Sequence, residues 1–243
     1  MIDRISPTVR PAQKPAGWQK WRDLLFLHWP VPTAVLRPLV PKSLELDLHE
    51  GVAYVGVVPF KMEGVRTRWL PSPLAFTFLE LNVRTYVYRE NQPGVYFFSL
   101  DAASSLAVWA ARQFWGLPYF RANMQLKPTG DSFLYESNRY GSNAHHRVKY
   151  RLGPPLGPSE PGTLEFFFLE RYLLFVERQR QLYLGQVHHQ PYPAQTAEVL
   201  ELDSGLFESV GLPTESSRPP IAHFASGVDV EIFDLRRVCP SPK

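Results

Sequence analysis

Segment after segment of this chain alternates between apolar and polar residues, and this period of two limits the folds that the chain can adopt. Alternation is typical of β-strands, because successive side chains of a strand point to opposite faces. Helical segments are few, whereas a doubly wound α/β protein needs a helix between successive parallel strands. The sequence therefore predicts an α+β fold, mostly β, built as a barrel or folded mixed sheet. The alternating segments are Val52–Phe60, Phe76–Tyr88, Val95–Leu100, Phe120–Leu126, Thr163–Leu169, Tyr172–Glu177, Gln181–Gln190 and Gly227–Leu235.

One or two helices interrupt the strands. The clearer one covers Ala102–Trp115, with Asp101 in the N-cap position and apolar residues repeating along one face. A shorter helix is expected to begin at Pro32 and to end near Pro38, because proline suits the first turn of a helix and interrupts its interior.

The chain has 243 residues, and closed β folds of about 200–250 residues commonly form a single domain. Residues 1–17 are polar and contain prolines, so we expect a loose N-terminal arm. Residues 18–238 are expected to form one domain, and residues 239–243 a short C-terminal tail. Hydrophobic residues make up 44% of the chain, which is enough to bury a core in a domain of this size.

Charge, cysteine content and hydropathy argue against several classes of protein. The net charge is only +3 and the basic residues are scattered, whereas nucleic-acid binding needs a clustered basic face. The single cysteine, Cys239, can form neither an internal disulfide nor a cysteine-based metal site. The N-terminus lacks the unbroken apolar stretch of a signal peptide, and no later run reaches about 18 apolar residues. The sequence predicts a cytoplasmic protein without nucleic-acid or membrane partners.

The segment Phe76–Tyr88 carries the most information about function. One strand face collects leucines and valines, and the other places Glu80, Asn82 and Arg84 about 7 Å apart among four aromatic residues. Solvated faces seldom carry so many aromatic side chains. We expect this face to line a cavity, with the three polar side chains shielded from solvent and hydrogen-bonded to each other or to neighbours. An oligomer contact, where aromatic residues and arginine are enriched, and a plain surface are the alternatives.

Neighbouring polar residues have structural explanations that compete with a role in the cavity. Asp101 is expected to cap the helix that follows it. Arg112, late in that helix, would interact favourably with the helix dipole at the surface. At the junction Glu170–Tyr172 we expect a structural salt bridge, and a role of Glu170 or Tyr172 in the cavity is the alternative.

The histidines do not form a metal-binding pattern. His188 and His189 are adjacent in a predicted strand and must point to opposite faces, so only one of them can reach a cavity. No HxxxH or HExxH spacing occurs. We therefore expect neither a metal nor a cofactor, and His188 is kept as a candidate ligand contact.

The order of motifs along the chain resembles the acetoacetate decarboxylase superfamily. The resemblance begins with Asp23–Asp47, continues with the strand ending at Phe78–Glu80 and reaches Ala111–Phe120. More closely, the chain resembles the bacterial YqjF-like proteins, a family of that superfamily without an assigned function. The matching motifs are VPFKM (Val58–Met62), ELNVRTYV (Glu80–Val87), SLDAA (Ser99–Ala103), GLPY (Gly116–Tyr119), LERYLLF (Leu169–Phe175) and HFASGVDV (His223–Val230).

The resemblance implies a β-barrel-containing α+β fold with a buried cavity. Carried over residue by residue, an active-site glutamate of the decarboxylase falls on Glu80 and an arginine before its first helix on Arg22. Its paired lysines fall on Tyr119 and Phe120, and its second active-site glutamate has no carboxylate counterpart here. That enzyme needs a neutral lysine to form an imine with its substrate, which a phenol or phenyl group cannot do. Lys61 and the other lysines are expected to keep their protons, so Schiff-base decarboxylation is excluded.

Three functions remain open. The first is a cavity protein that binds a small polar or carboxylated organic molecule and acts on it as a lyase or hydrolase without Schiff-base chemistry. The second is a non-catalytic ligand sensor or binding module, and the third is an interaction protein whose aromatic face forms a homo-oligomer. A fold alone does not assign a reaction. The candidate catalytic residues are Glu80, as acid or base, and Tyr119, as hydroxyl donor; the candidate ligand-binding residues are Arg84, Asn82, Arg112, Arg22 and His188.

Overall fold

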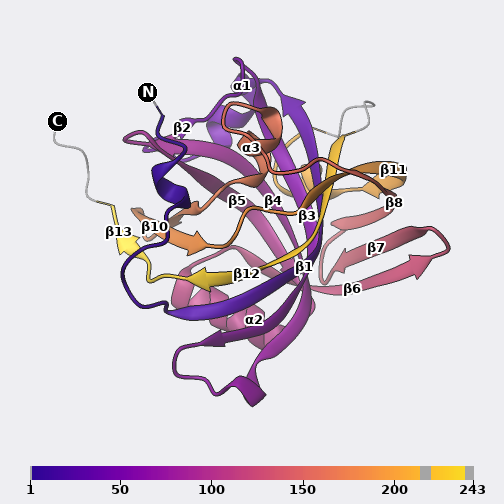
Figure 1. The fold of residues 1–243 in the computed structure, drawn as a ribbon, viewed down its shortest axis with the longest axis horizontal. Helices are drawn as coiled ribbons and strands as arrows, with labels where there is room; N and C mark the ends of the chain where they lie inside the picture. Colours follow the sequence, from indigo (N-terminus) through magenta and orange to yellow (C-terminus); the bar gives the residue numbers. More distant parts are fainter. Residues whose placement is uncertain (1, 214–219, 239–243) are drawn as a thin grey trace.

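A computed structural model describes residues 2–213 and 220–238 of the chain. Within them the chain forms one mixed sheet of 13 strands with a few short helices, which confirms the predicted α+β, mostly β fold (Figure 1). The predicted tail, residues 239–243, lies outside the described residues, as does Cys239. The strands are β1 (Gly17–Val31), β2 (Glu45–Leu46), β3 (Ala53–Thr67), β4 (Phe76–Arg89), β5 (Gln92–Ala102), β6 (Tyr119–Thr129), β7 (Ser132–Arg139), β8 (His145–Pro155), β9 (Leu173–Arg178), β10 (Gln181–His188), β11 (Ala194–Ser204), β12 (Ile221–Ile232) and β13 (Arg236–Arg237).

The helices are short and connect the strands. The predicted helix between Pro32 and Pro38 is present as an α-helical turn that continues into a 3-10 turn. The α-helices are α1 (Thr33–Leu36), α2 (Ser105–Ala110), α3 (Leu164–Leu169) and α4 (Leu206–Ser209). A π-helical turn, Ala111–Trp115, follows α2, and 3-10 turns lie at Ser6–Thr8, Arg37–Leu39 and Ser72–Leu74.

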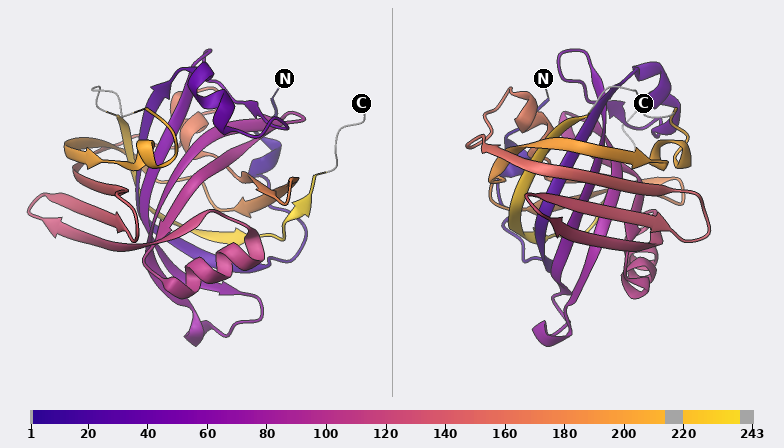
Figure 2. Two further views of the ribbon diagram at one scale, coloured as in Figure 1. Left: turned by 180° about the vertical axis from the view of Figure 1, so that it is seen from behind. Right: turned by 90° about the vertical axis from the view of Figure 1, so that its right-hand side faces the viewer.

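The sheet closes on itself in two places, where β4 pairs with β5 and where β10 pairs with β12. Following the pairings gives a smaller ring, β1–β3–β4–β5–β9–β10–β12, and a larger ring, β1–β3–β4–β5–β6–β7–β8–β11–β12. Both rings contain β12, β1, β3, β4 and β5, and we call the first four of these strands the shared wall. Figure 2 (right) shows β6, β7, β8 and β11 of the larger ring crossing one face of this wall.

Each face of the shared wall packs in its own apolar core. Leu24, Phe26 and Val58 point into the smaller ring. Leu25, Leu27 and Val57, which alternate with them along the same strands, point into the larger ring. The wall therefore has no solvated face over most of its length.

Burial on both faces explains why alternation does not predict β1, a strand of 15 residues. Residues 24–29 of β1 are all buried, and all of them except His28 are apolar. The His28 ring stacks on Phe168 at 3.8 Å, and its Nε2 lies 2.6 Å from the Tyr86 hydroxyl oxygen. A strand buried on both faces carries a continuous apolar run instead of an alternating one.

One predicted element is wrong, and a second begins later than predicted. The segment Thr163–Leu169 is not a strand, because Leu164–Leu169 forms α3, and the Thr163 hydroxyl caps it by accepting a bond from the Phe166 backbone N–H. Its last four residues are buried all round, and such a short apolar run has no periodicity that separates a helix from a strand. The helix predicted from Ala102 begins only at Ser105, and Ser104 caps it in place of Asp101.

Asp101 instead belongs to β5 and forms a buried ion pair, so the prediction that it caps a helix at the surface is wrong. Its Oδ1 accepts a bond from Arg139 Nε on β7 at 2.8 Å. Arg139 also donates to the Ser99 hydroxyl at 3.0 Å, and its guanidinium lies 4.1 Å from the centre of the Phe120 ring. The pair joins two strands of the larger ring across β6.

A second buried ion pair fixes the junction between α3 and β9. Arg171 Nη1 lies 2.6 Å from Asp47 Oδ2, and Asp47 also accepts two bonds of 2.6 Å from Arg4 in the N-terminal segment. The salt bridge expected at the junction Glu170–Tyr172 is confirmed.

Arg139→Met should lower the free energy of unfolding by about 3–5 kcal/mol, because it leaves the Asp101 carboxylate buried without its partner. Urea denaturation measures the loss. Arg147→Met is the matched control, since Arg147 pairs with Glu201 at the exposed surface of the sheet and should cost less than about 1 kcal/mol. Equal losses in the two variants would contradict a structural role for the buried pair.

Candidate functional site

A cavity of about 350 Å³ lies inside the smaller ring, between the shared wall, the β3–β4 connection and α2. One face of β4 lines it, with Phe76, Phe78, Glu80, Asn82 and Arg84. The alternation of the sequence therefore identifies the cavity face correctly. The same burial means that this aromatic face is not available as an oligomer contact.

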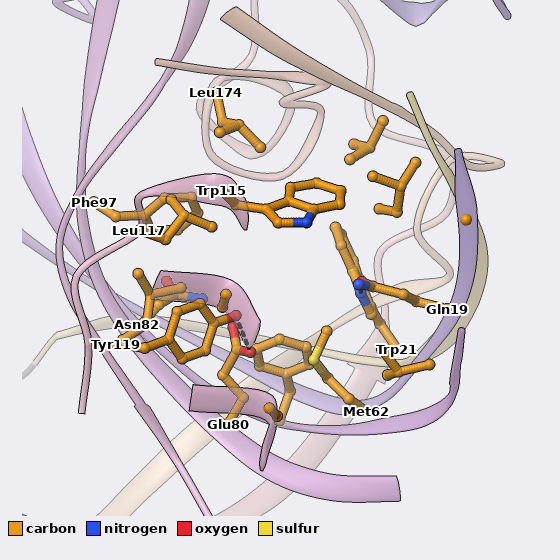
Figure 3. Close-up of a pocket in the computed structure, with 18 of the residues that line it drawn as sticks. Gln19, Trp21, Met62, Glu80, Asn82, Phe97, Trp115, Leu117, Tyr119 and Leu174 are labelled. Carbon is orange, nitrogen blue, oxygen red and sulfur yellow. Dashed lines mark hydrogen bonds between the residues drawn. The ribbon is translucent and has the colours of Figure 1, made fainter. Parts of the chain in front are cut away.

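Glu80 and Tyr119 form a hydrogen-bonded pair in the cavity wall (Figure 3). The Tyr119 hydroxyl donates to Glu80 Oε2 at 2.6 Å, and both residues are buried. The pair forms because β5 and β6 run parallel and Tyr119 begins β6 opposite Leu100. In addition, the Tyr135 hydroxyl donates to the backbone oxygen of Glu80 at 2.8 Å.

Burial raises the pKa of Glu80 to about 8. The nearby Asp101 carboxylate raises the pKa further, and the bond from Tyr119 opposes both effects because it stabilises the charged form. Burial and the Glu80 charge likewise hold the pKa of the Tyr119 hydroxyl well above its usual value. At neutral pH Glu80 therefore keeps its proton and is an acid that can donate it.

Arg84 lies in the cavity wall without an acidic partner. Its Nη2 donates to the Phe168 carbonyl oxygen at 3.2 Å, and its guanidinium carbon lies 5.7 Å from the ring centres of Phe26 and Tyr86. Its Nε is buried without a hydrogen-bond partner. Among the described residues no ion pair joins Arg84 to a carboxylate, so its charge faces the cavity uncompensated.

Asn82 lies between Glu80 and Arg84 on the strand and is only 4% exposed. Its Oδ1 is buried and has no hydrogen-bond partner among the described residues. The expectation that all three polar side chains would bond to each other or to neighbours is therefore wrong. Residues four positions apart on a strand are separated by about 13 Å, which keeps Glu80 and Arg84 from pairing.

The structure does not bring the other candidate residues into the cavity lining. Arg22 points outward and pairs with Asp229 at 2.5 Å. A bulge at Asp23, with φ of 52°, lets Trp21 and Leu24 both face the cavity on either side of it. Arg112 is exposed, as its surface interpretation predicts, and its Nε donates to the Tyr119 backbone oxygen at 2.6 Å.

His188 also lies outside the lining, next to the ring of Tyr172 with 6.4 Å between ring centres. Sequence reasoning missed Arg171 and Tyr192, which do line the cavity, whereas Tyr172, the alternative cavity residue at that junction, lines it as well. Arg171 differs from Arg84 because Asp47 neutralises it. Tyr192 lies between β10 and β11, in a segment with no periodic pattern that could have identified it.

No lysine of the described chain lines the cavity. Lys61 lies on β3 and pairs with Glu63, with 38% of its side chain exposed. Of the two positions that match the decarboxylase lysines, Tyr119 faces the cavity and Phe120 packs under Arg139. The described residues also contain no group of three histidine, cysteine, aspartate or glutamate side chains that could hold a metal ion.

Comparisons with known proteins agree with this fold. The model of the DUF2071 family, described as uncharacterized conserved protein, matches residues 18–229. The protein YqjF of Bacillus subtilis (strain 168) is 40% identical over 222 residues, which cover 90% of this chain and 91% of YqjF. The predicted resemblance to YqjF-like proteins is confirmed. None of the described helices is long and apolar enough to cross a membrane.

Solved structures of low sequence identity share the fold. The enduracididine biosynthesis enzyme MppR complexed with pyruvate has a TM-score of 0.64 and 12% identity, over 93% of this chain and 91% of that chain. An acetoacetate decarboxylase has a TM-score of 0.66 and 11% identity, over 98% of this chain and 99% of that chain. Such a likeness shows the architecture and leaves the reaction to the site residues.

The free energy of unfolding should fall between pH 4.5 and about 8 more steeply for the natural protein than for Glu80→Gln. The folded-state pKa of Glu80 is raised above its ordinary value of 4.5, so the stability it contributes is complete below pH 4.5 and is lost as the pH rises through about 8. The difference in slope should approach about 1.4 kcal/mol per pH unit. Urea denaturation at several pH values measures it.

The difference between the pH dependences of the two unfolding free energies isolates the contribution of Glu80. Buried histidines such as His146, whose pKa burial lowers to about 3, affect both proteins equally. Parallel curves would contradict a protonated Glu80.

Sodium borohydride added with acetoacetate should trap no covalent adduct, because no lysine of the described chain faces the cavity. Intact-protein mass spectrometry provides the measurement, with a lysine-dependent acetoacetate decarboxylase as the positive control. A mass increase on a lysine of this protein would overturn the exclusion of Schiff-base chemistry.

Proposed function

The chain belongs to the DUF2071 family, and from that premise and the geometry of its cavity we propose that it binds a small organic acid and transfers a proton to or from it without a Schiff base. In this proposal Arg84 holds the carboxylate of the ligand. Glu80, hydrogen-bonded to Tyr119, is the acid that exchanges the proton.

The observation that carries the proposal is the uncompensated Arg84 charge in the cavity wall. Arg84 is partly buried, and a charge withdrawn from water without an acidic partner is unfavourable; the chain pairs its buried arginines Arg139 and Arg171 with aspartates. A carboxylate ligand would neutralise the charge of Arg84 in the same way, because guanidinium groups bind carboxylates through two parallel hydrogen bonds. The unpartnered Asn82 Oδ1 offers an adjacent acceptor for a hydroxyl or amine of the ligand.

Glu80 supplies the chemical group. A carboxylic acid that stays protonated to about pH 8 can donate to a carbonyl or leaving oxygen of the ligand, and its conjugate base can take a proton back. The hydroxyl of Tyr119 stabilises the carboxylate that remains after the transfer. Lyase and hydrolase reactions both use such a step.

A non-catalytic binding module is the second candidate, and the separation of Glu80 from Arg84 favours it. Their positions on β4 are about 13 Å apart, and the Arg84 charge is not among the causes of the raised pKa of Glu80. A short acid held by Arg84 would then leave Glu80 without a reacting partner. Turnover that Glu80→Gln abolishes without weakening binding would favour the enzyme, and binding without turnover would favour the module.

The fold neighbour MppR supports an organic acid as the class of ligand, since its structure is of a complex with pyruvate. The identity of 12% means that MppR supplies a fold-level analogy only.

Arg84→Gln should weaken binding of an organic acid by about tenfold to a hundredfold, because a charged hydrogen bond contributes about 1.5–3 kcal/mol. Arg84→Lys should lose part of the affinity, since it keeps the charge but not the bidentate geometry. Isothermal titration with pyruvate, acetoacetate and lactate measures binding, and thermal melting checks folding.

Arg22→Gln is the matched control, because Arg22 lies outside the cavity lining and should leave affinity unchanged. If both Arg84 variants bind every acid as the natural protein does, the proposed anchor is wrong.

A further inference from the structure

Away from its polar residues, the cavity is bounded by apolar side chains. Val58, Met62, Phe78, Leu100, Leu169 and Leu173 line it, and all six are buried. A ligand without apolar groups would leave these walls facing water. Each methylene group that replaces that water should increase affinity about fourfold.

The size of the cavity also exceeds that of a short acid. Its volume of about 350 Å³ is near the lower end of the range found for ligand pockets, about 300–1,000 Å³. A short acid such as acetoacetate, with seven non-hydrogen atoms, would leave part of that volume to be filled by water against apolar walls.

The polar groups and the opening lie at different levels along β4. Ala102, which is followed by the short connection to α2, pairs with Glu80, whereas Arg84 pairs with Phe97, farther from α2. Leu106 of α2 lines the cavity and is 52% exposed, and Phe76 and Trp115, which are partly buried, line it too. Figure 3 shows the Trp115 ring extending across the cavity opposite Glu80. The route from Arg84 past Glu80 toward α2 therefore passes the apolar side chains of Leu106 and Trp115 at its outer end, while Gln19, Arg66 and Thr67 line the cavity on the side of β1 and β3.

From these observations, and resting on the proposed function, we propose that the ligand is a monocarboxylic acid with an apolar tail of several carbons. The carboxylate binds Arg84, and the tail lies along the apolar walls toward Leu106 and Trp115. In this arrangement the atoms near the head of the ligand pass Asn82 and Glu80. The tail thus bridges the distance that separates the anion site from the acid.

A series of straight-chain acids tests the tail. Isothermal titration with butyrate, hexanoate and octanoate should show Kd falling by about two orders of magnitude from butyrate to octanoate. Arg84→Gln should weaken binding of all three acids by a similar factor, because it removes only the head-group contact.

Two variants at the α2 end should act on the long acids alone. Ala107→Phe places a ring in the cavity and should weaken octanoate at least tenfold while leaving butyrate unchanged. Leu106→Ser removes a contact with the ligand tail at the partly exposed rim, where the fold tolerates change. It should reduce the increase in affinity from hexanoate to octanoate. Ala103→Phe is the matched control, since Ala103 is exposed and outside the cavity lining.

The two ways of failing are distinct. Affinity that does not change with chain length, while Arg84→Gln still weakens binding, would overturn the apolar tail and leave the proposed function intact. Affinity that rises with chain length but is unaffected by Arg84→Gln would overturn the carboxylate anchor, and with it the proposed function.

Discussion

The central part of the shared wall of β12, β1, β3 and β4 is buried on both faces, and the rest of the structure depends on this double burial. A strand segment in that part of the wall cannot place a polar side chain in bulk water. On the face of β4 toward the larger ring, Leu81 and Val83 fill an apolar core. On the opposite face, Glu80, Asn82 and Arg84 line the cavity. The polar residues of this part of β4 therefore face the interior of the smaller ring.

Electrostatics then separates the structural charges from the functional ones. The buried Asp101–Arg139 pair and the buried Asp47–Arg171 pair satisfy their own charges. Glu80 has no cationic partner, and burial keeps it protonated instead. Arg84 cannot be neutralised in that way, because a guanidinium keeps its proton in proteins. An external anion would balance the charge of Arg84, which has no carboxylate partner among the described residues, and this asymmetry between the two groups is the basis of the expected ligand.

The sequence predicts those parts of the fold in which one pattern has one structural meaning. The alternating face of β4 is such a case, and so is the turn after Pro32. Strand β1 was not predicted because burial on both faces removes alternation. Strand β8 does alternate, with buried Val148 and Tyr150 between the charged Arg147, Lys149 and Arg151, so its sequence pattern could have identified it.

The sequence predicts only those features of the candidate site that lie within a single strand. That Glu80 and Arg84 share a face follows from the period of two, whereas the bond between Glu80 and Tyr119 depends on the parallel pairing of β5 with β6. The outward position of Arg22 depends on the bulge at Asp23, and no local sequence pattern announces that bulge. The ion pair of Asp101 likewise joins residues far apart in the chain.

The central claim is that the cavity holds Glu80 as a neutral acid at physiological pH. Carbon-13 NMR of the protein labelled at glutamate carboxyl carbons measures this directly, with Glu80→Gln identifying the Glu80 signal. The account predicts that this signal titrates with a pKa of about 8. A titration near the ordinary glutamate value of 4.5 would mean that Glu80 is ionised in the folded protein, and would contradict the claim.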